Sequence, residues 1–264
     1  MIDPRFSEAE LDQCREHITS FIREQIAAAN ADGAVLGLSG GIDSTLTGHL
    51  AVDALGADNL HALVLPATVS GDENMSDAER VARELDITYD VIEIEPLIDS
   101  LLTAYPEAKG DREAVGNARA RVRAVLNYLV ANHENRLVLG TGNRSEAAVG
   151  YFTKYGDGAV DCHPIGNLYK AQVRQLARHV GVPEDLASKT ATAELWTDQT
   201  DEDELGISYE TLDSILVTHI DGPLSVAATC RELDVTPETV DRVREMYERS
   251  EHKRRAPPSP DPLT

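Results

Sequence analysis

Short apolar runs alternate along the chain with longer segments in which apolar residues recur every three or four positions. The short runs cover Ala34 to Leu38, Leu60 to Leu65, Tyr89 to Ile94 and Arg136 to Gly140. Each run has the length of a strand buried in a parallel sheet. The periodic segments predict helices over Ser7 to Ala29 with Ser7 as N-cap, from Thr45, over Ser76 to Leu85 and from Glu113. This order predicts an α/β fold with a doubly wound parallel sheet flanked by helices, whose ligands collect at the carboxyl ends of the strands.

The first predicted strand ends in the small and polar turn SGGIDS at residues 39–44, which leads into a helix. Two glycines let the backbone approach a ligand closely, and the helix N-terminus with its flanking hydroxyls favours an anion such as phosphate. No lysine follows, so the turn is not the GxxxxGK[ST] loop of ordinary P-loop NTPases. Asp43 would repel phosphate unless Mg²⁺ lay between them, so we expect it to be a metal ligand. The alternative is a plain glycine turn in which Asp43 caps the helix.

A second glycine-bearing turn follows the fourth predicted strand and runs from Gly140 to Asp161. It combines glycines, polar side chains and aromatics without a period of 2 or 3.6, as a ligand-binding loop over a rigid sheet does. Glu146 could supply a second carboxylate near the metal, and Lys154 could meet an anionic substrate. Taken singly, each is more typical of an ordinary surface position.

The long helix from Glu113 carries an apolar stripe and three arginines. The stripe comprises Val115, Ala118, Val122, Val125, Leu126 and Leu129. Alternate side chains on a helix diverge by about 160 degrees. We therefore expect at most one or two of Arg119, Arg121 and Arg123 to face a ligand, the alternative being a solvated arginine face.

Acidic residues outnumber basic ones by 46 to 24, which gives a formal charge of −22 spread along all 264 residues. Because 42% of the chain is hydrophobic and strongly periodic, disorder is excluded. A dispersed acidic surface suits high salt, which screens the repulsion between carboxylates, so we expect a protein of a halophile. Only five lysines are present, and each is therefore a candidate to face an anion: Lys109, Lys154, Lys170, Lys189 and Lys253. For Lys109 the alternative is a solvated surface lysine.

Length and residue usage predict a single domain over residues 1–256 and a disordered Pro-rich tail over 257–264. No run of 18 apolar residues and no charged-then-apolar start is present, so no membrane span or signal peptide is expected, and the protein should be cytoplasmic. The three widely spaced cysteines, Cys14, Cys162 and Cys230, argue against a disulfide framework or a zinc site.

Several motifs together resemble those of ammonia-dependent NAD synthetases, members of the N-type ATP pyrophosphatases. In order they are SGGIDS at 39–44, NARARVR at 117–123, GTGNRSE at 140–146, GYFTKYGDG at 150–158, LYK at 168–170, KTATAELW at 189–196, DQTDEDELG at 198–206 and EHKRR at 251–255. The resemblance covers nearly the whole chain and implies an adenine nucleotide alpha hydrolase-like fold. It is to the ammonia-dependent form because glutamine-using members carry an additional glutaminase domain.

The resemblance also implies roles for individual residues. ATP is implied to contact Gly37, Leu38, Ser39, Gly40, Gly41, Ile42, Asp43, Ser44, Thr141, Lys170 and Thr192. Mg²⁺ is implied to bind Asp43 and Glu146. Deamido-NAD is implied to contact Arg121, Lys154, Asp161, His252 and Lys253. Asp43, Lys170 and Asp161 are the implied catalytic residues, and Asp161 is also conceivable as a binder of ammonium.

The implied reaction is the ATP- and Mg²⁺-dependent amidation of deamido-NAD by ammonia, which gives NAD, AMP and pyrophosphate through an acyl-adenylate. The resemblance further implies a homodimer with substrate at the subunit interface. The chain departs from the family pattern at Ala191, where the pattern has proline. The acidic run Asp201 to Glu204 is expected to be a solvated loop, and its resemblance to a lid-like segment of the family suggests that it could order when substrate binds.

Two alternative functions remain open. One keeps the ATP pyrophosphatase chemistry with a different acceptor. The other is DNA binding, because Ser225 to Arg249 predicts two short amphipathic helices that resemble a helix-turn-helix. The second of those helices mixes acidic with basic residues and the whole chain is acidic, so the phosphate-neutralising charge of a DNA-binding protein is lacking. We therefore expect no nucleic-acid partner.

Overall fold

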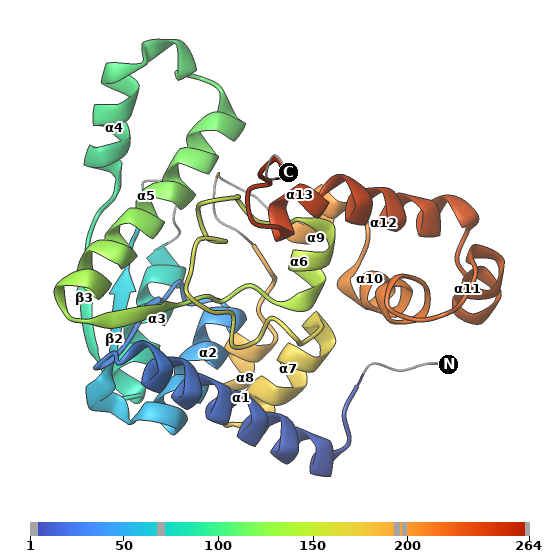
Figure 1. The fold of residues 1–264 in the computed structure, drawn as a ribbon, viewed down its shortest axis with the longest axis horizontal. Helices are drawn as coiled ribbons and strands as arrows, with labels where there is room; N and C mark the ends of the chain where they lie inside the picture. The colour runs from blue at the N-terminus through green and yellow to red at the C-terminus, as the bar shows by residue number, and fades with distance from the viewer. Residues whose placement is uncertain (1–4, 68–71, 193–195, 197–199, 262–264) are drawn as a thin grey trace.

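The computed structural model describes residues 5–67, 72–192, 196 and 200–261 (Figure 1). Its strands are β1 Gly33–Gly37, β2 Leu60–Val64, β3 Thr88–Val91 and β4 Arg136–Leu139. Its α-helices are α1 Glu8–Ala29, α2 Ile42–Leu55, α3 Asp72–Glu84, α4 Glu95–Ala104, α5 Arg112–His133, α6 Arg144–Val149, α7 Lys170–His179, α8 Glu184–Ala187, α9 Asp201–Leu205, α10 Tyr209–Ile215, α11 Val226–Leu233, α12 Pro237–Arg249 and α13 Glu251–Arg254. Shorter turns are η1 Ala57–Asn59, η2 Pro106–Ala108 and the π-helical η3 Leu216–Ile220.

The four strands form one parallel sheet in the order β3-β2-β1-β4. The chain leaves β1 toward β2 and β3 and later returns to β1's other side with β4, so β1 marks the point where the direction of winding reverses. The predicted doubly wound α/β sheet is thus confirmed. The third strand is shorter than predicted and ends at Val91, three residues before Ile94.

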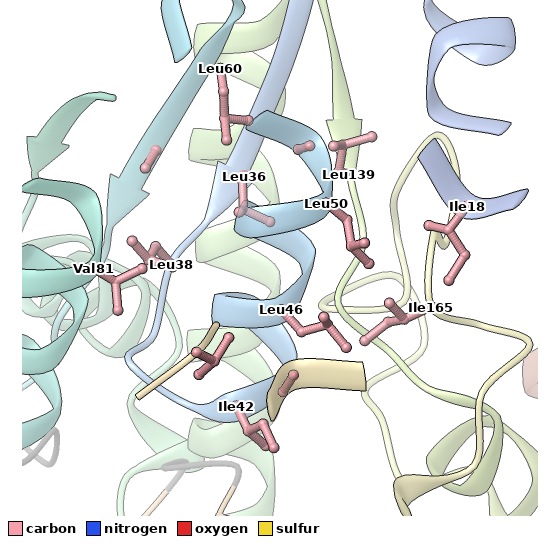
Figure 2. Packing of buried hydrophobic residues seen from close by; sticks show 14 of the residues in the cluster. Ile18, Leu36, Leu38, Ile42, Leu46, Leu50, Leu60, Val81, Leu139 and Ile165 are labelled. Carbon is pink, nitrogen blue, oxygen red and sulfur yellow. The ribbon is translucent and has the colours of Figure 1, made fainter. Parts of the chain in front are cut away.

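Alternate residues of the strands face two separate apolar cores. Ala34 and Leu36 of β1 pack in the core that α1, α2, α3 and α7 cover, whereas Val35 faces the core beneath α5. Figure 2 shows Leu36 of β1 together with Leu46 and Leu50 of α2 in the first of these cores. Helices cover both faces, which explains why the strands read as continuous apolar runs rather than as alternating ones.

The capping prediction for the first helix is confirmed at Ser7. Its backbone N–H donates to Glu10 Oε2 at 2.8 Å, and Ser7 and Glu10 form a capping box at the start of α1. α1 then lies along α2 and α7 and contributes Ile18 and Ile22, both almost fully buried, to the first core.

A third core lies within the C-terminal helices, which gather at one side of the molecule (Figure 1). Leu212 and Ile215 of α10 pack there with Val240 and Val243 of α12. The two predicted helices of the helix-turn-helix-like segment are confirmed as α11 and α12. The buried face of α12 is occupied by this core.

The structure corrects two expectations about local structure. The six stripe residues of α5 do not form one buried face: Val125 is 66% and Leu129 63% exposed, whereas Leu126 packs in the core beneath the helix. The acidic run begins the short helix α9, whose first residue Asp201 is buried rather than solvated. The helix α4 was not among the predicted elements.

Cys14, Cys162 and Cys230 are free thiols, as the sequence predicts. Residues 256–261 have neither helix nor strand. Among the described residues no helix combines the length and apolar character needed to cross a membrane.

Leu36→Ala tests the central core. Leu36 is fully buried between β1 and α2, so its truncation should lower the free energy of unfolding by about 2 to 5 kcal/mol. Val91→Thr is the control, because Val91 is 45% exposed on the edge strand and an isosteric change there should stay within about 0.5 kcal/mol. Urea unfolding in concentrated KCl measures both, and equal effects would contradict this description of the core.

Candidate active site

A cavity of about 840 Å³ opens at the carboxyl ends of the strands. Its walls come from the turn after β1, from Leu65 and Pro66 after β2, and from Gly140 and Thr141 after β4. α5, the loop after α6 and the segment after α8 supply most of its remaining walls. The expected ligand-binding edge of the sheet is therefore hollow.

The turn after β1 is held in shape by its own hydroxyls. The backbone N–H of Ser39 donates to Ser44 Oγ at 3.2 Å, and the two serine hydroxyl oxygens lie 3.1 Å apart. Gly40 has φ +78°, a left-handed conformation that favours glycine. Immediately afterwards α2 begins at Ile42, so the positive end of its dipole faces the cavity.

Three charged side chains from distant parts of the chain meet beside this turn. Lys170, the first residue of α7, is 1% exposed. Its Nζ donates to Asp43 Oδ2 at 2.6 Å and to Glu146 Oε1 at 3.0 Å. The structure thus brings together the sequence-predicted ligand pair and the sequence-predicted lysine in one buried cluster.

Asn143 holds both carboxylates in place. Its Nδ2 donates to Asp43 Oδ1 at 2.8 Å, and its backbone N–H donates to Glu146 Oε2 at 3.4 Å. Its Oδ1 accepts from the backbone N–H of Glu146 at 3.0 Å. The fully buried Asn143 is the N-cap of α6, and Glu146 is the third residue of that helix, so the pair forms a capping box. Sequence reasoning missed this role, although the spacing of Asn143 and Glu146 is the signal of such a box.

Burial shapes the charges of this cluster. Burial raises the pKa of Glu146 to about 7, with the charge of Asp43 acting in the same direction and Lys170 opposing both. Burial alone would lower the pKa of Lys170, but the carboxylates of Asp43 and Glu146 outweigh it and raise that pKa above its ordinary value. Lys170 is therefore a permanent cation at the cavity wall.

A further buried acid, missed by sequence reasoning, lies behind the cluster. Asp201 accepts from the hydroxyl of Tyr209 at 2.8 Å, and burial raises the pKa of Asp201. The ammonium of Lys170 lies 5.0 Å from the centre of the Tyr209 ring, a cation–π contact. No sequence signal links these residues, because they meet only when α9 and α10 fold against α6 and α7.

The donor set fits a magnesium ion that also binds phosphate. Asp43 and Glu146 provide two carboxylates, which are hard oxygen ligands. Within the described ranges no group of three or more His, Cys, Asp or Glu residues could hold a metal ion by itself. Mg²⁺ commonly binds one or two carboxylates and completes its shell with water and substrate phosphate, which matches this arrangement.

Most of the residues expected to contact ATP line this one cavity. Gly37, Leu38, Ser39, Gly41, Ile42, Asp43, Ser44, Thr141, Lys170 and Thr192 all do so, and the buried Gly40 shapes the turn. Lys189, which also lines the cavity, pairs with Asp77. Parts of two motifs, residues 193–195 and 198–199, lie outside the described residues.

Of the five residues expected to contact deamido-NAD, four lie around the loop after α6, and the fifth, Asp161, is described separately below. Lys253 lines the cavity, where its ammonium donates to the carbonyls of Gly150 at 2.7 Å and Phe152 at 2.8 Å. Arg121 donates to the Lys154 carbonyl at 3.2 Å, and Lys154 Nζ donates to the His252 carbonyl at 2.5 Å. Arg121, Lys154 and His252 therefore form one chain of contacts, and Lys253 follows His252 directly in the sequence. We call these four residues the cationic cluster.

Asp161 lies apart from the cationic cluster, on the exposed side of β4. Its Oδ2 accepts from the backbone N–H of Val138 at 2.7 Å, and its Oδ1 accepts from the Tyr128 hydroxyl at 3.2 Å. Asp161 is not among the residues that line the large cavity. It completes the hydrogen bonding at the edge of the sheet.

The three arginines of α5 diverge as the helical geometry predicts. Arg119 pairs with Glu95 at 3.0 Å and Arg121 joins the cationic cluster. Arg123 donates to the carbonyl of Leu65 at 3.0 Å and is the one of the three that lines the cavity.

Comparisons with known proteins agree with this site. The family model described as NAD synthase matches residues 14–257. An NH(3)-dependent NAD(+) synthetase from Halobacterium salinarum is 62% identical over 259 residues, which are 98% of this chain and 97% of the relative. That relative comes from a halobacterium, consistent with the expectation drawn from the acidic surface.

Solved structures with the same fold include an NMN synthetase from Francisella tularensis, with TM-score 0.83 and 34% identity over 97% of this chain and 99% of that one. An NH3-dependent NAD synthetase from Campylobacter jejuni, in complex with nitrate, has TM-score 0.79 and 29% identity over 95% and 99% of the two chains. By sequence match and by fold, this chain belongs to the NAD synthase family.

Proposed function

We propose that this protein amidates deamido-NAD with ammonia and ATP to give NAD, AMP and pyrophosphate. The observation that carries the proposal is the meeting of Lys170, Asp43 and Glu146 beside the turn after β1. The identity of 62% to an NH(3)-dependent NAD(+) synthetase supports the choice of substrates. Neither DNA binding nor a different acceptor for the ATP chemistry has comparable support.

The proposed reaction begins when the nicotinate carboxylate of deamido-NAD attacks the α-phosphorus of ATP. The bond from that phosphorus to the bridging oxygen breaks, and pyrophosphate leaves with the bonding electrons. Ammonia then attacks the acyl carbon of the adenylate, loses a proton and expels AMP. Neither step needs a protein nucleophile, so positioning and charge neutralisation are the tasks of the chain.

The residues beside the turn are suited to those tasks. Lys170 places a buried positive charge where negative charge builds up on the departing pyrophosphate, and the N-terminus of α2 offers backbone N–H donors. Asp43 and Glu146 would hold Mg²⁺, which as a Lewis acid neutralises phosphate charge when bound.

We place the dinucleotide on the cationic cluster of Arg121, Lys154, His252 and Lys253. Lys253 lines the cavity, Arg121 lies on α5, and Lys154 lies in the loop after α6. Positive groups in these places suit a pyrophosphate that spans from the reaction centre to the outer surface. In the proposal Asp161, at the edge of the sheet, contacts a polar part of the substrate.

A homodimer is proposed from the exposed side of α5. Val125 and Leu129 are one helical turn apart, 66% and 63% exposed, and Arg121 lies one turn before them on the same side. Leu97 and Leu101 of the adjoining α4 are also about half exposed. A second copy of the chain covering this face would border on the cationic cluster and shield the bound dinucleotide.

We place the protein in the cytoplasm of a halophile, where ATP and concentrated salt coexist.

The direct test is an assay with ATP, Mg²⁺, deamido-NAD and an ammonium salt in concentrated KCl, scored for AMP and NAD. Folded protein that forms neither product would refute the proposal. Glutamine in place of ammonium should give little NAD. Replacing deamido-NAD by nicotinate mononucleotide separates this function from that of an NMN synthetase, and preferential turnover of the mononucleotide would reassign the substrate.

Lys170→Ala and Asp43→Ala should each lower kcat by about 100-fold or more, because each removes a charged group beside the phosphates. Steady-state kinetics measures the effect. Lys109→Ala is the matched control, since Lys109 is an exposed lysine outside the large cavity and should leave kcat unchanged. Wild-type turnover in both site variants would count against the assigned roles.

Val125→Glu combined with Leu129→Glu should convert a dimer into monomers and raise the KM for deamido-NAD, because two charges would enter an apolar contact. Light scattering after size-exclusion chromatography measures the mass. Ala28→Glu, which adds a charge at an exposed position of α1, should leave the dimer intact. A wild-type monomer at assay concentration would refute the proposed dimer.

A further inference from the structure

A fully buried carboxylate, Asp213 of α10, lies outside the residues that line the cavity. Both of its oxygens accept hydrogen bonds. Oδ1 accepts from the hydroxyl of Ser145, and Oδ2 accepts from the backbone N–H of Ala171 at 2.9 Å. A carboxylate this deeply buried destabilises the folded protein unless its oxygens accept hydrogen bonds. The two groups that donate to Asp213 are therefore important for its role.

The same serine continues the connection to the active site. Ser145 Oγ accepts from the backbone N–H of Lys170 at 2.9 Å. The first two N–H groups of α7, those of Lys170 and Ala171, are therefore bound by side chains from two other helices, α6 and α10. These groups lack partners within α7 itself, so their bonds fix where the helix begins.

We infer that Asp213 is a positioning residue, which through Ser145 and the start of α7 sets the ammonium of Lys170 between Asp43 and Glu146. The inference rests on the proposed role of Lys170. Ser145 directly precedes Glu146, so α6 holds the backbone of Lys170 with one residue and the side chain of Lys170 with the next. Asp213 fixes the orientation of the Ser145 hydroxyl, because the hydroxyl donates its hydrogen to Asp213 and accepts from Lys170.

The charge of Asp213 suits this position. Asp213 belongs to α10, but its side chain lies beside the N-terminus of the ten-residue α7, where the helix dipole favours an anion. Burial raises the pKa of Asp213 to about 6, while the bonds from Ser145 and Ala171 oppose that rise. At pH 8 it is therefore a carboxylate, with both oxygens able to accept. Asparagine has the same shape but no charge and only one accepting oxygen. If that oxygen keeps the bond from Ala171, the amide nitrogen can only donate to Ser145, so Asp213→Asn reverses the hydrogen bond that orients the Ser145 hydroxyl.

The experiment is a double-mutant cycle between Asp213 and Lys170, with Mg-ATP binding measured by calorimetry and kcat by steady-state assay at pH 8. With Lys170 present, Asp213→Asn should lower kcat about 10-fold and weaken Mg-ATP binding severalfold, with the KM for deamido-NAD nearly unchanged. With Lys170→Met, Asp213→Asn should change Mg-ATP binding less than twofold, because the group that Asp213 positions is absent.

Thr218→Val is the matched control for lost buried hydrogen bonding. Thr218 is fully buried close to Asp213 in sequence, and its hydroxyl bonds only to carbonyls of its own helical segment, Ser214 at 2.7 Å and Ile215 at 3.5 Å. It should lower the melting temperature without changing kcat. Ser145→Ala provides the second route, and it should reproduce the Asp213→Asn effect and add little to it.

Three results would overturn the inference: Asp213→Asn and Ser145→Ala with wild-type kcat, an equal effect of Asp213→Asn in the Lys170→Met background, or an equal loss of kcat in Thr218→Val. If Asp213→Asn does not fold, Ser145→Ala takes its place in the cycle. The binding measurement needs no acceptor substrate. Failure of the proposed reaction would appear instead as wild-type protein that binds Mg-ATP but forms no NAD.

Discussion

The site depends on one buried ammonium group held between two carboxylates. A lysine this far from water keeps its charge only because Asp43 and Glu146 compensate it, and the two carboxylates tolerate each other only because Lys170 lies between them. The three residues come from α2, α6 and α7. Any movement of one of these helices would therefore leave an uncompensated charge in the interior, so the cluster also fixes how the helices approach one another.

The parallel sheet explains why these helices can meet at all. In a doubly wound fold each crossover helix starts where a strand has ended, so α2 and α6 begin at the same edge as the turns after β1 and β4. α7 begins there too, and Lys170 is its first residue. The reacting groups therefore occupy helix starts, where backbone N–H groups and dipoles are already directed at an anion.

The sequence predicted the sheet and the central cluster but not the residues behind it. The strand and the turn that contain Asp43 are local patterns, and the motifs around Glu146 and Lys170 have a recognisable order. Asp201, Tyr209 and Asp213 meet the site only through packing of α9 and α10, which no short-range pattern encodes. For the same reason the exposure of Val125 was not foreseen, since periodicity marks an apolar side without saying what covers it.

The scarcity of lysine has a practical consequence for chemical labelling. Lys170 is buried, Lys189 is paired with Asp77, and Lys154 and Lys253 donate to backbone carbonyls. Lys109 is the exposed member of the five. An amine-reactive dye or tether would thus couple to the side chains of this protein chiefly at Lys109, beyond the walls of the large cavity. Among the side chains, Lys109 is therefore the natural point for attaching the enzyme to a support.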